Sequence, residues 1–104
     1  MYKRYEYYYI VQSEDWISDL KLLYEGILKV SGRQDTAEKF INKIITKTNI
    51  LDTFPYIGIN LENRSPKFKG LYGIMFNQYI IVYRIKKDTV VLETLLNTKK
   101  DIKK

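Results

Sequence analysis

The chain has 104 residues, 45% of them hydrophobic and 29% charged, which predicts one globular, soluble domain spanning residues 1–104. It contains no cysteine and no histidine, so disulfides, thiolate or imidazole metal ligands, and cysteine or histidine catalysis are excluded, and we expect no metal and no cofactor. The net charge of +6 falls entirely within residues 62–104, which hold ten Lys and Arg against four Asp and Glu.

The beginning of the chain lacks the uninterrupted apolar core of a signal peptide. No apolar run is long enough to span a membrane. We therefore expect a cytoplasmic protein with no membrane partner.

Residues 5–11 alternate and are rich in Tyr, Ile and Val, which predicts a first strand. In this strand Tyr5, Tyr7 and Tyr9 share one face, which we expect to be partly buried. Tyr8 points the other way and is expected to be exposed.

Two helices follow. Ser13 is suited to cap the first helix, whose apolar residues recur at spacings of three and four and which should end near residues 31–32. Asp35 is expected to cap the second helix, with Glu38 in the capping-box position. The largest apolar residues of these helices, Trp16 and Phe40, are predicted core residues.

The second helix should stop at Phe54-Pro55, and residues 60–67 are polar and predicted to form a loop. Three β-rich runs follow. They are separated by the short breaks Asn77-Gln78 and Lys86-Lys87-Asp88, which predicts an antiparallel meander. The expected fold is α+β: an N-terminal strand, a helical hairpin, then an antiparallel three-strand meander, with the hairpin covering one face of the sheet.

The sheet and the tail after it carry the net positive charge of the molecule, together with several tyrosines. Cations neutralise phosphates, and aromatic rings stack on bases. A basic sheet bearing tyrosines is therefore a candidate surface for nucleic acid.

Several short patterns resemble, in order and over nearly the whole chain, the RelE/ParE family of bacterial toxins from type II toxin–antitoxin pairs. Residues 13–20 are similar to the family's S-x-x-A-x-x-D-L pattern, with Trp16 in place of the usual Ala. Residues 36–38 and the F-P-x-x-G stretch at 54–58 look like its second helix and exit. The Lys69-Gly70-Leu71-Tyr72 stretch, the strands after it and residues 99–102 look like its three strands and its R-D-Y-like end.

The resemblance implies a RelE-like two-layer fold, with the first strand added beside the meander, and a cognate antitoxin protein as partner. It implies one of two activities: ribosome-dependent mRNA cleavage or inhibition of DNA gyrase. The chain departs from the family at three places. Tyr72-Gly73 stand where many relatives carry Arg, Asn97-Thr98 where relatives often place His or Tyr, and Lys100-Asp101 where Arg-Asp is usual.

Metal-free RNA cleavage needs a base for the 2′-hydroxyl, a cation for the developing phosphorane-like charge and an acid for the leaving oxygen. Without histidine, the candidate catalytic residues are Lys69, Tyr72, Arg84, Glu93, Lys99 and Lys100. The candidate nucleic-acid-binding residues are Lys67, Lys69, Arg84, Lys99, Lys100 and Lys103. An alternative role for Arg84 is an ion pair with Glu93 on the neighbouring strand.

The sequence thus favours a toxin that acts on ribosome-bound mRNA as a metal-independent endonuclease. The alternatives are a non-enzymatic inhibitor of DNA gyrase and a diverged, non-toxic member that still binds its antitoxin. The basic sheet favours cleavage, and the missing histidine and the departures at arginine positions favour the alternatives.

Overall fold

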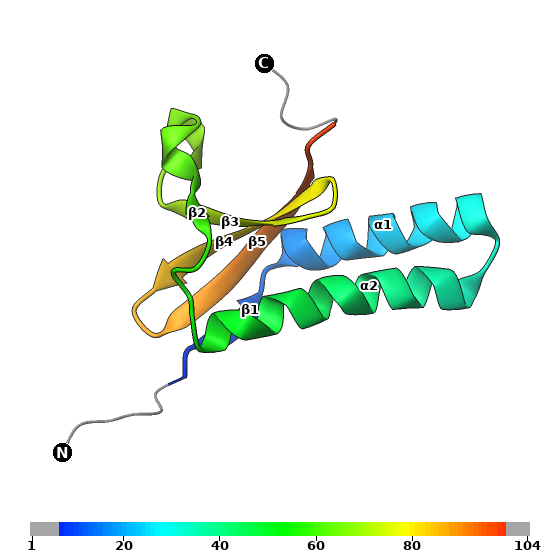
Figure 1. The fold of residues 1–104 in the computed structure, drawn as a ribbon, viewed down its shortest axis with the longest axis horizontal. Coiled ribbons are helices and arrows are strands. Elements are labelled where there is room, and N and C mark those ends of the chain that lie inside the picture. The colour runs from blue at the N-terminus through cyan, green and yellow to red at the C-terminus, as the bar shows by residue number, and fades with distance from the viewer. Residues whose placement is uncertain (1–6, 100–104) are drawn as a thin grey trace.

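The computed structural model describes residues 7–99, which form a five-stranded sheet with a helical hairpin on one face (Figure 1). In chain order the elements are β1 (Tyr9–Gln12), α1 (Glu14–Ser31), α2 (Gln34–Thr48), β2 (Ile59–Asn60), β3 (Leu71–Phe76), β4 (Tyr79–Lys86) and β5 (Thr89–Asn97). Three short 3₁₀ turns accompany them: η1 (Asn49–Asp52), η2 (Leu61–Asn63) and η3 (Pro66–Phe68). The predicted α+β class and the order of its main elements are confirmed.

The strands lie in the order β1-β5-β4-β3-β2. β3, β4 and β5 form the predicted antiparallel meander, and β1 pairs in parallel with β5, beside the meander as expected. The sequence does not predict β2. This strand contributes only Ile59 and Asn60, opposite Gly73 and Tyr72, and two residues are too few to show an alternating pattern. The stretch expected to be a loop thus contains the end of this strand, η2 and the first two residues of η3.

The start of α1 is fixed to the sheet through Ser13. Its hydroxyl accepts a hydrogen bond from the Trp16 N–H at 3.1 Å and donates one to the Glu93 carbonyl at 2.9 Å. At the other end Gly32 has a φ of 69°, the left-handed conformation that glycine adopts most easily. Both predicted ends of the first helix are confirmed.

The start of α2 differs from the prediction. Arg33, in an extended conformation, occupies the cap position without a side-chain cap, and Asp35 lies inside the first turn. The Asp35 carboxylate accepts a hydrogen bond from the Arg33 guanidinium at 2.9 Å, which lowers the pKa of Asp35. The predicted Asp35 cap is wrong because the chain enters the helix two residues earlier, where no capping side chain is available.

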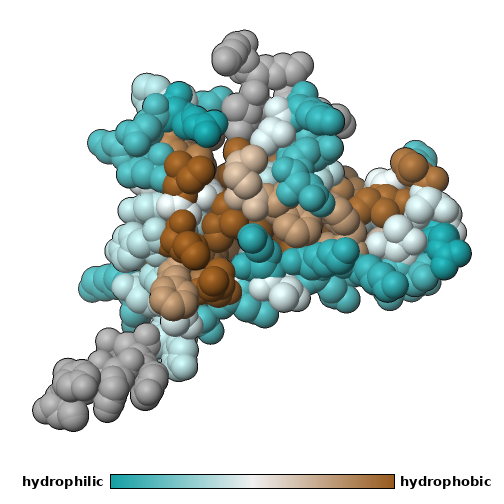
Figure 2. Space-filling view, in the orientation of Figure 1, coloured by the Kyte–Doolittle hydropathy of each residue, from teal (hydrophilic) through white to brown (hydrophobic). Residues whose placement is uncertain are grey.

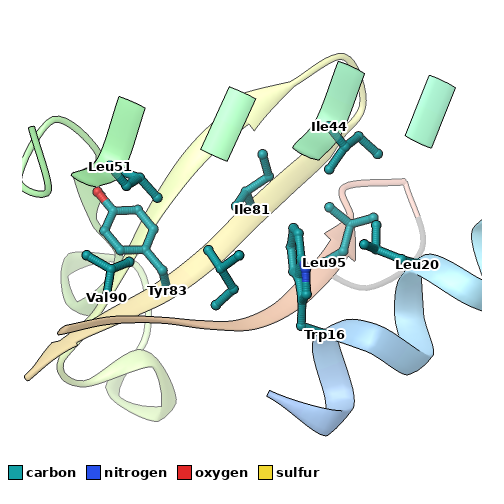
Figure 3. Packing of buried hydrophobic residues seen from close by; sticks show 9 residues of the cluster. Trp16, Leu20, Ile44, Leu51, Ile81, Tyr83, Val90 and Leu95 are labelled. Atoms are coloured by element: carbon teal, nitrogen blue, oxygen red, sulfur yellow. The ribbon is translucent and has the colours of Figure 1, made fainter. Parts of the chain in front are cut away.

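The core lies between the helical hairpin and the sheet (Figure 3). Its fully or nearly buried members come from α1, α2, η1, β4 and β5: Trp16, Leu20, Ile44, Leu51, Ile81, Tyr83, Val90, Leu92 and Leu95. Trp16 has no exposed surface, whereas Phe40 is only half-buried, edge-on to Phe76 and Tyr79. A smaller cluster on the opposite face joins Leu61 to Ile80 and Val82.

The predicted orientation of the N-terminal tyrosines is reversed. Tyr8 packs against the core, and Tyr7 and Tyr9 are exposed. Tyr5 lies outside the described residues. The Tyr8 N–H donates to the Asp52 carbonyl at the end of η1, and Ile10 packs against the same core cluster. These contacts determine which face of β1 meets the helices. The sequence alone does not decide this, because tyrosines lie on both faces of the strand.

Hydrophobic side chains remain on the surface beside β2 and the end of α2 (Figure 2). Neither α1 nor α2 is long and apolar enough to cross a membrane, and these are the α-helices of residues 7–99.

Candidate functional site

The sheet has a face covered by α1 and α2 and an opposite face, here called the helix-free face. Leu71 pairs with Arg84, and Tyr72 pairs with Tyr83. Because paired residues share a face and neighbours alternate, Arg84 and Tyr72 lie on opposite faces. The Tyr72 ring stacks on Tyr83, 5.7 Å between centroids, on the helix-covered side. These two candidate catalytic residues are therefore not brought together.

Arg84 lies on the helix-free face beside an acid and a glycine. Its Nε donates to Oε2 of Glu93 at 3.2 Å, and the two side chains are 36% and 32% exposed. The ion pair considered as an alternative is thus present. Gly70 has a φ of 76°, and a Cβ added there would lie 3.0 Å from Nη1 of Arg84. The backbone next to Lys69 therefore runs close against the guanidinium.

Glu93 reaches Arg84 because β5 contains a bulge. Val82 pairs with Thr94 and Tyr83 with Leu92, so Glu93 is the extra residue between them. The helix α1 holds both sides of this bulge. Ser13 binds the Glu93 carbonyl, and the Asp19 carboxylate accepts hydrogen bonds from the Thr94 hydroxyl and the Leu95 N–H.

The other basic candidates divide between the two ends of the sheet. Lys67 and Lys69 are exposed just before β3, at the end where Arg84 lies. Lys86 shares the face of Arg84 two residues further along β4, and sequence reasoning missed it although the Arg-x-Lys alternation was the available signal. We call Lys67, Lys69, Arg84 and Lys86 the basic cluster.

Lys99 lies at the opposite end of the sheet. It follows β5 beyond Asn97, which pairs with Tyr79, and the Thr98 N–H donates to the Gln78 carbonyl at the β3–β4 turn. The five residue-to-residue steps from Tyr79 to Arg84 span about 17 Å along β4. Lys99 is thus remote from the basic cluster. The candidates Lys100 and Lys103 lie outside the described residues. Within residues 7–99, no group of three or more acidic side chains is placed to hold a metal ion.

A buried tyrosine organises the chain between η1 and β2. The Tyr83 hydroxyl donates to the Pro55 carbonyl at 2.7 Å and accepts from the Gly58 N–H at 3.0 Å. A Cβ on Gly58 would lie 2.5 Å from this hydroxyl, so the approach depends on glycine. Burial raises the pKa of the Tyr83 phenol.

Tyr83→Phe should lower the free energy of unfolding by about 1–3 kcal/mol, since it leaves the Pro55 carbonyl and the Gly58 N–H without their partner. Urea unfolding measures this directly. A phenol whose pKa is raised on folding keeps its proton while the unfolded chain loses it. The parent should therefore lose stability as the pH rises above about 10, more than Tyr83→Phe does. Parallel stability–pH curves for the two proteins would contradict this role.

Comparisons with known proteins bear on both the fold and the family. A family model described as "ParE toxin of type II toxin-antitoxin system, parDE" matches residues 10–102. Among solved structures, a chain of the "Chromosomal ParDE TA system from P. aeruginosa" aligns with a TM-score of 0.75 and 14% identity, covering 89% of this chain and 98% of that one. At this identity the structural match establishes the fold alone. No curated protein matches the sequence.

Proposed function

The chain belongs to the ParE toxin family of type II toxin–antitoxin systems, and from this we propose that it inhibits DNA gyrase without cutting a substrate and is neutralised by a cognate antitoxin. One observation carries the choice of activity. Within residues 7–99, the residues expected to cut RNA lie on both faces and at both ends of the sheet, with Tyr72 stacked on the helix-covered side and Lys99 remote from Arg84. A dispersed set cannot act together on one phosphate.

The basic cluster is suited to binding an anion. Glu93 occupies the Nε of Arg84, and the remaining guanidinium nitrogens stay available for a phosphate. Lys67, Lys69 and Lys86 add exposed positive charge around it. Such a surface favours association with a polyanionic complex such as gyrase on its DNA.

The second candidate is the metal-independent mRNA endonuclease, acting on the ribosome. Arg84 and Glu93 do lie together on the helix-free face, and Lys69 precedes the glycine that approaches Arg84, so the three would serve as the cation, the base and the acid of a cleavage reaction. Against this role, an oxygen of the Glu93 carboxylate is already engaged by the Arg84 guanidinium, 3.2 Å away.

Induction of the chain in cells, with and without the protein encoded by the neighbouring gene, tests the proposal. We expect growth arrest that the neighbour relieves, and loss of plasmid supercoiling before translation falls. If translation fails first while supercoiling is intact, gyrase inhibition is wrong and the chain acts as the mRNA endonuclease. If growth continues normally, the chain is the diverged, non-toxic member.

Glu93→Gln should strengthen the binding of a polyanion, because Arg84 then loses the carboxylate that competes with phosphate. With a short DNA duplex as probe, the affinity should rise on the order of threefold. Glu62→Gln is the matched control, since Glu62 is an exposed acid that binds the Gly70 N–H and makes no ion pair with Arg84. An equal rise in both variants would mean that only net charge matters.

A further inference from the structure

The helix-free face of the sheet is divided into a covered half and an open half. In the covered half, Leu61 of η2 packs on Ile80 and Val82 of β4. Further along β4, from Arg84 toward the β4–β5 turn, the side chains of this face are exposed or half-buried. The open half consists of the side chains that β1, β4 and β5 place there: Tyr9, Val11, Arg84, Lys86, Thr89 and Val91.

Strand pairing places a tyrosine and a lysine in one row of the open half. Tyr8 packs against the core, so its neighbour Tyr9 points to the helix-free face. Tyr9 pairs with Thr89, and Thr89 pairs with Lys86. Tyr9 and Lys86 are therefore separated by two strand spacings, about 10 Å. The phenol ring is 67% exposed and the lysine is exposed, so both can contact one ligand.

The next row continues the same arrangement. Val11 pairs with Val91, and Val91 pairs with Arg84. Val11 is 48% exposed, and the two valines extend the apolar surface of Tyr9 across β5 toward the guanidinium. The open half is thus aromatic and apolar at β1 and cationic at β4.

This combination matches the chemistry of a nucleic-acid strand, in which bases and phosphates alternate. A base stacks on an aromatic ring, and a phosphate binds lysine or arginine. The acids that border the surface are engaged, because Glu93 bonds to Arg84 and the Asp88 carboxylate accepts from the Thr89 hydroxyl. An acidic peptide would use the cations and leave the ring of Tyr9 without a partner.

We propose that the open half binds an unpaired nucleic-acid strand, with a base stacked on Tyr9 and the adjoining phosphates on Arg84 and Lys86. The inference rests on the proposed function, which assigns a polyanion to the basic cluster. It adds Tyr9 to that site. It also specifies an unpaired strand, because in a duplex the base faces are stacked on one another and are not available to a ring.

Removal of the Tyr9 ring tests the stacking. The probes are a short unpaired DNA oligonucleotide, RNA of the same sequence and inorganic polyphosphate, each titrated against the full chain by fluorescence anisotropy. Tyr9→Ala should weaken binding of the oligonucleotides on the order of tenfold. Its affinity for polyphosphate, which has no bases, should stay unchanged. Tyr9→Phe should bind like the parent, since stacking needs the ring and not the hydroxyl.

Tyr56→Ala is the matched control. Tyr56 is 61% exposed and lies edge-on to Tyr72, whose ring stacks on the helix-covered side. This variant should bind every probe like the parent, whereas Arg84→Ala should weaken binding of the oligonucleotides and of polyphosphate alike. Thermal unfolding checks that each variant folds, and Tyr9→Leu, which keeps an apolar side chain on β1, replaces Tyr9→Ala if that variant does not fold.

The site is overturned if Tyr9→Ala binds the oligonucleotides as the parent does, or if Tyr56→Ala loses as much. Tighter binding of duplex DNA or of an acidic peptide than of the unpaired strand overturns it as well. A loss at Tyr9 supports the site with either oligonucleotide: tighter binding of DNA indicates a strand opened by gyrase, and tighter binding of RNA indicates a transcript. A parent that inhibits gyrase yet binds no oligonucleotide overturns this site alone. A parent that binds through Tyr9 and leaves gyrase active overturns the proposed function alone.

Discussion

Replacing Trp16 by alanine should lower the free energy of unfolding by about 3–5 kcal/mol. The indole has no exposed surface and packs among residues of both helices and the sheet (Figure 3). Its removal leaves a large cavity at the junction of α1 with β5. The indole N–H also donates to Oε1 of Gln12 at 3.1 Å, so the change loses a hydrogen bond from α1 to β1.

Phe40→Ala is the comparison, and it should cost less, about 2 kcal/mol, because Phe40 is only half-buried. From sequence, both rings are expected to be equally buried, and the structure separates them. Urea unfolding of the parent and both variants measures the difference. Equal and small losses would mean that the indole is not enclosed by the helical hairpin.

Arg84→Ala should weaken inhibition of the target on the order of tenfold to a hundredfold, since a guanidinium that binds phosphate makes charge-assisted hydrogen bonds. The cost in stability should be about 0–1 kcal/mol, because the pair with Glu93 is one-third exposed on each side. Growth inhibition after induction, together with thermal unfolding, separates the two effects.

Lys99→Ala is the control for Arg84→Ala. It removes a cation at the far end of the sheet from Arg84. If Lys99→Ala and Arg84→Ala reduce inhibition equally, the location of the positive charge does not matter, and the basic cluster is not a defined site.

The helices and the meander were predictable from sequence because their signals are local. Spacings of three and four, the Ser13 cap and the two short breaks each specify their own element. Choices that depend on distant contacts were not predictable. The orientation of Tyr8 is set by the Asp52 carbonyl, and β2 exists only because β3 lies beside it.

Some features of the candidate site could likewise be predicted from local sequence, and others could not. The two-residue turn at Asn77-Gln78 determines that Phe76 pairs with Tyr79, and so that Tyr72 and Arg84 lie on opposite faces. The length of the turn therefore predicts from sequence that Tyr72 and Arg84 lie on opposite faces. The bulge that brings Glu93 to Arg84 depends on α1 binding β5, and the apolar hollow lined by Ile50, Ile57 and Met75 is built from separate segments. Neither leaves a local pattern.

A supercoiling assay with purified DNA gyrase separates gyrase inhibition from RNA cleavage. The parent chain should block supercoiling of relaxed plasmid, the antitoxin should restore it, and Arg84→Ala should require a much higher concentration for the same effect. The parent should leave ribosome-bound mRNA intact in the presence of EDTA. Normal gyrase activity at a saturating concentration of the parent chain, together with cleavage of ribosome-bound mRNA in EDTA by the parent but not by Arg84→Ala, would contradict gyrase inhibition.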